Sequence, residues 1–300
     1  MAAQLEKEIW INQIMENFYP DSSFLQYGMD FSSLVDNNAI NLAEAGVDPK
    51  VLINNTAYPI TVLQRNDTAL RIELDKFETE NTLVRRPDVI QYAYNQLESV
   101  LMGHRNQLRA KTAERAAHAY APYEDTDYTP VILTTGIADN TGHKTLTFND
   151  ILSLKERFDS MEIPIEQRFL VLHPSHVTDL IRLDTKWFKD ITDIVNGQPK
   201  RFAGFGMLQF SRMPYYDLAT MKKMPFGSTP TAGFGYCSFA FQAGEVMKAD
   251  GDIYMYMHLD DPKERATIVG FDKRFIAVPI RNKGIGAIVS AIADDTDTDV

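Results

Sequence analysis

Hydrophobic and polar residues alternate most clearly in the segment that runs from residue 69 to residue 79. In the stretch ALRIELDKFET, the apolar residues Leu70, Ile72 and Leu74 alternate with charged ones. This period of two is typical of a β-strand with one apolar face. The stretch VLINNTAYPITVLQ precedes it, and the intervening RNDT supplies Asn66 and Asp67, which tolerate the backbone angles of a tight reversal. The pattern therefore predicts a long, charged β-hairpin.

The apolar face of this predicted hairpin needs a cover. A two-stranded ribbon is at best marginally stable alone in water. We therefore expect another subunit to bury this face on assembly. The residues expected at that interface are Ile60, Val62, Arg65, Leu70, Ile72 and Leu74.

A very long amphipathic helix is expected directly after the hairpin. Pro87 and Asp88 suit its first turn, and Pro122 ends it after Tyr120. Such a helix would be roughly 50 Å long at 1.5 Å per residue, whereas globular helices average about 11–12 residues. Apolar residues and one histidine recur every three or four positions and form the stripe expected to be buried: Ile90, Tyr94, Leu97, Leu101, His104 and Leu108.

The remaining pattern predicts a mixture of helices and strands. The N-terminus begins with an amphipathic helix that Pro20 ends, and a polar arm follows it. A helix over 148–161 is expected to be capped by Thr147 or Asn149. A buried strand within 163–173 and a helix over 175–184 come next, and residues 186–232 are expected to be mostly loops. Further strands are predicted at 234–242, 252–259, 265–270, 274–280 and 284–291, before an acidic tail too polar to pack.

Composition and charge narrow the classes of function. The chain has 44% hydrophobic and 24% charged residues, which is enough to bury an ordinary core. Its 30 basic and 41 acidic residues give a formal net charge of −11, which argues against general affinity for nucleic acid. No run approaches the roughly 20 apolar residues of a membrane span, and the N-terminus has no signal-peptide pattern. We expect a soluble protein without a membrane partner.

The sequence offers no convincing catalytic, cofactor or metal site. The glycine clusters GFGMLQF and GFGYCSF lack the third glycine of a dinucleotide loop and are expected to be turns. Cys237, the only cysteine, is expected to be a small buried apolar residue. His173 and His176 in LHPSH would serve the alternative of a soluble α/β enzyme, but a cap or a satisfied hydrogen bond is the expected role. His104 is expected to be a hydrogen-bonded core histidine.

The order of elements resembles the major capsid protein of tailed bacteriophages, a fold shared with encapsulins and the floor of herpesvirus capsids. The segments that carry the resemblance are INLAEAGVDPKVLINN, LDKFETENTLV, YNQLESVLMGHRNQL and RFLVLHPSHVTDLIRLD. The resemblance implies an α+β fold. Its parts would be an N-terminal arm (1–35), a lead-in and extended β-hairpin loop (36–86), a peripheral domain with the long spine helix (87–145), an axial domain (146–262), and terminal strands of the peripheral domain with the acidic tail (263–300).

The resemblance also implies a function. The chain would be the repeating subunit of an icosahedral phage head, assembled as hexamers and pentamers around double-stranded DNA that it contacts weakly and without sequence specificity. It would be made in the bacterial host cytoplasm and reside in the virion, with a portal as partner. Some members carry a cleaved scaffolding segment ahead of the arm, and this sequence shows no such segment. We therefore expect that the sequence is a mature form or that a separate scaffolding protein is used. An encapsulin-type compartment is the alternative shell.

Some members of that family link their subunits covalently through a hairpin lysine. Here Lys76 is the only lysine of the hairpin and lies near its base. We therefore expect no such cross-link.

Overall fold

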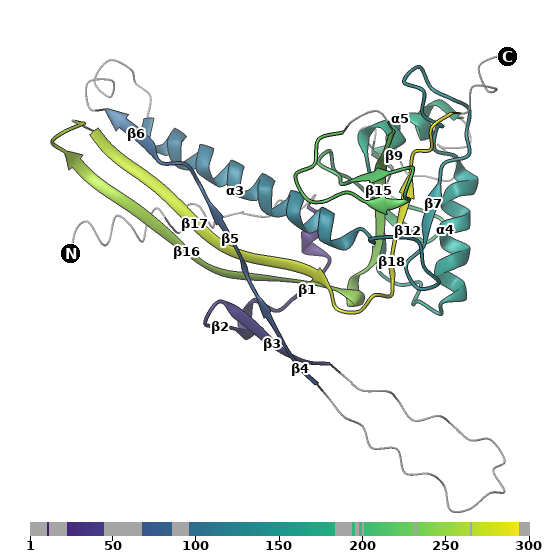
Figure 1. Cartoon of the computed structure of the whole chain (residues 1–300), viewed down its shortest axis with the longest axis horizontal. Helices are drawn as coiled ribbons and strands as arrows, with labels where there is room; N and C mark the ends of the chain where they lie inside the picture. The colour runs from purple at the N-terminus through teal and green to yellow at the C-terminus, as the bar shows by residue number, and fades with distance from the viewer. Residues whose placement is uncertain are drawn as a thin grey trace, which may run out of the picture.

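The computed structural model describes residue 11 and residues 23–44, 68–85, 96–183, 194–195, 198–199, 201–230, 233–264 and 266–293. Two sheets and one long helix form the framework of this described chain (Figure 1). No helix in these ranges has the length and apolar character to cross a membrane.

The first sheet is a long, narrow ribbon. Its two main strands, β16 (Val246–Asp261) and β17 (Ala266–Pro279), run antiparallel along nearly their whole length. The short strands β5 (Asp75–Glu78) and β6 (Thr82–Arg85) pair with the far edge of β17, and β1 (Met29–Asp30) pairs with the start of β16. Helix α3 (Gln96–Tyr120) lies along one face of this ribbon (Figure 1). The result is an elongated arm.

The second sheet forms a compact unit at the C-terminal end of α3 (Figure 1). Its strand order is β11 (Arg201–Phe202), β12 (Phe205–Gln209), β8 (Arg168–Leu172), β15 (Phe234–Gln242), β13 (Tyr215–Asp217) and β14 (Lys222–Lys223). Strand β18 (Ile285–Val289) also pairs with β15, and β7 (Val131–Leu133) pairs with β18.

Helices cover both faces of the compact sheet. The helices α4 (Phe148–Ser160) and α5 (Pro174–Leu183) pack on one face through Leu154, Phe158 and Leu180. The C-terminal half of α3 packs on the other face, where Tyr120 is fully buried beside aromatic side chains of β15. Helix α3 therefore joins the core of the ribbon to the core of the compact unit.

The smaller elements complete the described chain. Strands β2 (Val35–Asp36), β3 (Ala39–Glu44) and β4 (Thr68–Glu73) form a three-stranded sheet, and β9 (Ile194–Val195) pairs with β10 (Gln198–Pro199). Three single turns of 3-10 helix, η1 (Phe24–Gln26), η2 (Ser32–Leu34) and η3 (Ala243–Glu245), connect strands.

Several predicted elements are confirmed. Strand β15 occupies the predicted range 234–242, and α4, α5, β8 and β18 fall within a few residues of expectation. Thr147 caps α4 in a capping box: its hydroxyl accepts from the Asp150 N–H, and Asp150 accepts from the Thr147 N–H. Helix α3 ends at the predicted Tyr120, and its expected first residues lie outside the described ranges.

Other predictions were wrong in detail. The strands expected at 265–270 and 274–280 are one strand, β17, because its pairing with β16 continues through residues 271–273. The region 186–232, expected to be mostly loops, contains β12, a strand inside the compact sheet, and β7 lies in the segment 123–145, where the sequence had indicated only a polar connector. Strand β16 lies in the ribbon and β18 in the compact sheet, so the pairing of strands does not follow the boundary expected at residue 262.

Candidate assembly surfaces

The base of the extended loop is a ladder between β3 and β4. The strands pair antiparallel from Ala39 opposite Glu73 to Glu44 opposite Thr68. The strand that was expected to pair with the return strand, residues 51–64, lies outside the described ranges, as do Ile60, Val62 and Arg65. Leu70 lies in β4 opposite Leu42. Within the described chain, the return strand of the predicted hairpin, β4, therefore pairs with β3, which precedes the loop.

The apolar face at this base is covered within one chain. Leu74 is only 4% exposed and packs with Ile40, Ala249 and Ile276, and Ile72 packs half-buried against the same cluster. The expectation that this face is buried only on assembly is therefore wrong for Leu74 and, in part, for Ile72. Residues far apart in the sequence supply the cover, and local alternation carries no signal of that contact.

The stripe on α3 faces the ribbon where the structure describes it. Leu101 and Leu108 are buried against Ile253 and Phe271 of the ribbon, and Ile11 packs against the same cluster. Ile90 and Tyr94 lie outside the described residues, and Leu97 lies in α3 with its side chain outside the description.

His104 lies in this stripe but differs from expectation in its hydrogen bonding. Its ring packs against the Phe271 ring with centroids 5.2 Å apart, and burial lowers its pKa. Its Nε2 atom has no hydrogen-bond partner within the described chain. The ring lines a groove of about 920 Å³ between α3 and the β5–β6 segment, which also includes Gly103, Gln107 and Thr79. A buried histidine is confirmed, but the expected hydrogen bond is absent at this nitrogen.

The face of the ribbon that points away from α3 carries exposed aromatic residues. Ile253 and Met255 of β16 point into the core, whereas Tyr254 and Tyr256 are 50% and 57% exposed. The Tyr256 hydroxyl donates to Asp272 at 3.0 Å. Alternation in IYMYM could have indicated this surface from sequence, because aromatic residues commonly lie at protein interfaces. The sequence prediction placed a strand here without recognising the exposed tyrosines.

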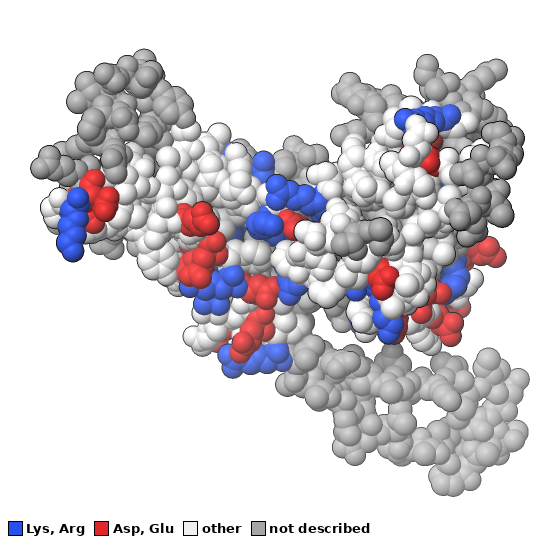
Figure 2. Space-filling model, turned by 45° about the horizontal axis from the view of Figure 1, so that its top comes forward, with Lys and Arg blue, Asp and Glu red and all other residues white. Residues whose placement is uncertain are grey.

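Charged side chains on the arm are mostly paired locally. Arg115 of α3 bonds to Asp75 of β5 at 2.8 Å, and Lys111 pairs with Glu114 at 3.0 Å. Lys76 pairs with Asp272 at 3.3 Å and with Glu78. Figure 2 shows basic and acidic groups interspersed over this view of the molecule. The described part of this face therefore presents no broad positive patch that would attract a polyanion.

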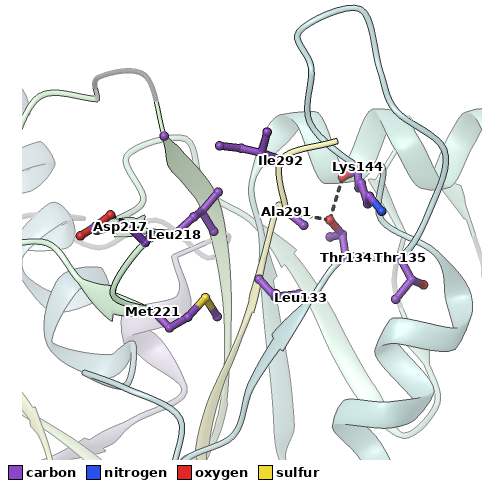
Figure 3. A pocket seen from close by; sticks show the side chains of 11 residues that line it. Leu133, Thr134, Thr135, Lys144, Asp217, Leu218, Met221, Ala291 and Ile292 are labelled. Atoms are coloured by element: carbon purple, nitrogen blue, oxygen red, sulfur yellow. Dashed lines mark hydrogen bonds between the residues drawn. The ribbon is translucent and has the colours of Figure 1, made fainter. Parts of the chain in front are cut away.

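Strand β13 pairs with the first residues of β15, and β18 pairs with Cys237–Phe241. A pocket lies between the segments that follow these two strands. The space between them, about 700 Å³, is lined by Leu218 and Met221 on one side and by Leu133 and Ile292 on the other (Figure 3). The Thr134 hydroxyl fixes one wall, since it donates to the Lys144 carbonyl and accepts from the Ala291 N–H (Figure 3).

The histidines considered for the enzyme alternative form a satisfied internal network. His176 is fully buried, and its Nδ1 and Nε2 atoms lie 2.6 and 2.7 Å from the hydroxyls of Ser238 and Ser290. His173 Nδ1 lies 2.6 Å from the Ser175 hydroxyl, and its ring stacks on Tyr236. Burial lowers the pKa of His173 to about 4 and that of His176 to about 3. Both histidines hold elements together, and neither nitrogen of His176 is free to act as a base or ligand.

Cys237 is fully buried in β15, as expected, and burial raises the pKa of its thiol. Within the described ranges, no three His, Cys, Asp or Glu residues come together as a metal site.

The chain is similar to known proteins in its structure, whereas its sequence matches none of those compared. No protein-family model and no curated protein matches the sequence. Among solved structures, the capsid of Ralstonia phage GP4 is similar with a TM-score of 0.65, 10% identity and coverage of 90% of this chain and 88% of that one. The capsid of the cyanophage P-SCSP1u matches with a TM-score of 0.63, 15% identity and coverage of 89% and 87%.

A shell protein of another kind is also similar. The virus-like particle from Pyrococcus furiosus matches with a TM-score of 0.56, 9% identity and coverage of 94% of this chain and 99% of that one. At these identities the likeness shows a shared fold. It extends over the elongated arm and the compact unit together.

Proposed function

We propose that this chain, which has the major capsid fold of tailed bacteriophages, is the repeating subunit of an icosahedral phage head that encloses double-stranded DNA. The observation that carries the proposal is the extent of the likeness: about nine-tenths of this chain and of the phage capsid subunits superpose as one architecture. A fold does not by itself specify a function, but His176, one of the two histidines considered for an enzyme, is engaged at both ring nitrogens by serine hydroxyls of the core.

The parts of the chain are assigned roles on this basis. Residues 1–35 are the N-terminal arm, and residues 36–86 contain the extended loop that lies over a neighbouring subunit. Helix α3 with the ribbon forms the peripheral domain. The compact unit forms the axial domain, which meets its copies around five-fold and six-fold centres. The strand pairing supports moving β16 to the peripheral domain and β18 to the axial domain.

The proposed partners are many copies of the same chain, arranged as hexamers and pentamers. A scaffolding protein and a portal take part in assembly, and the completed shell is part of the virion. Contact with packaged DNA is weak and independent of sequence. The formal charge of −11 and the mixed surface of Figure 2 support this, because strong binding to a polyanion needs concentrated positive charge.

An encapsulin-type compartment is the second candidate, and the similarity to the Pyrococcus furiosus particle favours it. Both candidates predict that the full-length chain, produced together with any scaffolding protein that it uses, forms closed particles visible by negative-stain electron microscopy. A soluble enzyme would instead sediment as a small oligomer. Particles isolated from the source cells and treated with nuclease then separate the two shells: a phage head protects double-stranded DNA, whereas a compartment retains a protein cargo.

A further inference from the structure

Two short connections of the described chain lead directly between strands of the compact sheet and strands of the ribbon (Figure 1). The outgoing connection is η3, between β15 and β16, and the returning connection is the segment 280–284, between β17 and β18. Pairing stops at Phe241 opposite Ile285 on the compact side and resumes at Val246 opposite Pro279 on the ribbon side. Hinges between rigid parts are commonly a few such residues at the ends of elements.

Backbone hydrogen bonds hold these two connections against each other. The Gln242 N–H donates to the Gly284 carbonyl at 2.9 Å, beside the compact sheet. The Ile280 N–H donates to the Glu245 carbonyl at 2.8 Å, beside the ribbon. Since one bond lies at each end of the junction, the two connections must bend together.

The side chain of Glu245 lies across the returning connection. Its carboxylate accepts two hydrogen bonds from Arg281, one from Nη2 at 2.8 Å and one from Nε at 3.1 Å. At the other end of the connection, Gly284 has a φ of +71°, and a Cβ atom there would lie 2.8 Å from the Glu245 Cγ atom. The side chain of Glu245 is only 10% exposed, whereas that of Arg281 is 69% exposed. Glu245 therefore contacts the returning connection at both its ribbon end and its compact end.

The C-terminal end of α3 attaches to both sheets close to this junction. The Tyr120 hydroxyl donates to the Met247 carbonyl of β16 at 3.1 Å. The Tyr120 ring is fully buried against Phe239 and Phe241 of β15. Because this attachment holds the two sheets together at one place, a change in the angle between them has to be absorbed in η3 and residues 280–284.

We propose that the Glu245–Arg281 pair is a clamp that fixes the angle between the ribbon and the compact unit, and that this angle sets the curvature of the assembled shell. The second part rests on the proposed shell function. A bidentate pair between arginine and a carboxylate fixes the relative orientation of its two groups, whereas an ion pair with an exposed partner adds little to stability. The clamp therefore acts on the shape of the subunit more than on its folding.

Distances within the unassembled full-length subunit test the clamp without any reference to a shell. Spin labels on Tyr254→Cys in the ribbon and Leu152→Cys in the compact unit report the angle through their separation, measured by pulsed electron paramagnetic resonance. Both positions are about half exposed, and the native Cys237 is fully buried. The test variant combines Glu245→Gln with Arg281→Ala, which removes one charge of each sign.

The matched control combines Glu124→Gln with Lys222→Ala, which removes an ion pair of 3.0 Å inside the compact unit. The test variant should widen the distance distribution or shift its mean, and the control should leave the wild-type distribution unchanged. Both should melt within about 4 °C of wild type. An unchanged distribution in a folded test variant, or an equal change in the control, would overturn the clamp.

Arg281→Lys separates the geometry of the pair from its charge. The lysine keeps a positive charge beside the Glu245 carboxylate but cannot form the two parallel bonds of a guanidinium. This variant should fold and should still give a broader distribution than wild type. A distribution identical to that of wild type would show that charge alone suffices and would contradict a bidentate clamp.

Particle size tests the second part of the proposal. Wild-type particles should have one diameter by negative-stain electron microscopy, whereas the test variant should give particles of several diameters or open sheets. Uniform particles of wild-type diameter from a test variant whose subunit distances have changed would overturn the link between this angle and curvature. Absence of wild-type particles would overturn the proposed shell function, and the subunit distances would still decide whether the clamp exists.

Discussion

The Nε2 atom of His176 lies 2.7 Å from the Ser290 hydroxyl, which is 114 residues further along the chain. The Nδ1 atom of the same ring lies 2.6 Å from the Ser238 hydroxyl. Helix α5, strand β15 and the end of β18 are thus joined by one neutral imidazole in a fully buried position. Protonation would require a charge in this core, where both partners are already engaged.

The subunit should lose stability on acidification because of this ring. The unfolded chain binds a proton at His176 below about pH 6.5, whereas burial lowers the pKa in the folded protein to about 3. Between these values the unfolded state carries more protons, so stability rises with pH in this window and falls as pH is lowered. From pH 7.5 to pH 5 the loss is about 2 kcal/mol from this residue.

Urea unfolding of the unassembled subunit at several pH values measures this effect. His176→Gln, whose amide can still bond to the serine hydroxyls, should weaken the dependence of unfolding free energy on pH below 6.5, and the contribution of His173 should remain. His258→Gln removes an exposed ring and serves as the matched control. An unchanged dependence in the His176 variant would mean that another group causes the acid sensitivity.

Replacing Gly235 with alanine should destabilise the subunit, and replacing Gly103 with alanine should stabilise it. A Cβ atom at Gly235 would lie 2.5 Å from the Ser290 carbonyl oxygen, so Gly235→Ala forces backbone displacement between β15 and the residue that follows β18. A loss of about 1–3 kcal/mol is expected. At Gly103, inside α3, a Cβ atom would meet nothing within 4 Å. Gly103→Ala should therefore stabilise the subunit by about 0.5–1 kcal/mol through helix propensity.

The melting temperatures of the two variants, compared with wild type, test these predictions: that of Gly235→Ala should be lower and that of Gly103→Ala higher. A stabilised Gly235 variant would mean that β15 and the chain at Ser290 separate more easily than their packing indicates. A destabilised Gly103 variant would indicate that the groove beside His104 is tighter in solution than in the structure.

Local sequence patterns predicted the elements whose partners are near or whose surroundings are uniformly apolar. Strand β15 and the capping box of Thr147 and Asp150 belong to this group, because a continuous apolar run and an N-cap are local signals. The burial of Leu74 and the bonds of His176 were not predictable in the same way. They depend on Ile40, Ala249, Ser238 and Ser290, whose positions are fixed only by the tertiary fold.

The same reason explains why β17 was predicted as two separate strands. Gly270 and the charged pair Asp272–Lys273 break the apolar pattern and suggested a gap between two strands. In the structure, Lys273 forms a buried ion pair with Asp250, and Asp272 accepts from Tyr256. Cross-strand partners thus stabilise charged residues within a continuous strand, and no local pattern reports those partners.

We expect no covalent bond between subunits in mature particles. Cys237 is fully buried, so its thiol cannot reach another chain. Lys76 is held by Glu78 and Asp272, and its hydrogen bond to Glu78 raises its pKa. A protonated amine is a poor nucleophile, which disfavours an amide bond to a neighbour. Particles boiled in denaturant should give one band near 34 kDa, and a ladder of higher multimers would contradict this.

Shortening the extended loop should affect assembly of the shell without affecting folding of the subunit. The β3–β4 ladder ends with Glu44 opposite Thr68, and its base is covered by Leu74, Ile40 and Ile276 within one chain. Replacing residues 45–67 with Asn-Gly would close this ladder as a two-residue hairpin, since that dipeptide favours the turn. The shortened subunit should remain soluble and melt near the wild-type temperature, because every contact just named is retained.

The same variant should fail to form closed particles, even with its scaffolding protein present. If the removed segment covers a neighbour, each large aliphatic side chain that it buries contributes about 1.5–3 kcal/mol to association. A control variant that changes only the expected turn, Asp67→Gly, leaves all the expected interface residues in place and should still assemble. Normal particles from the shortened chain would show that this loop has no role between subunits. A shortened chain that cannot fold would show that residues 45–67 stabilise their own subunit.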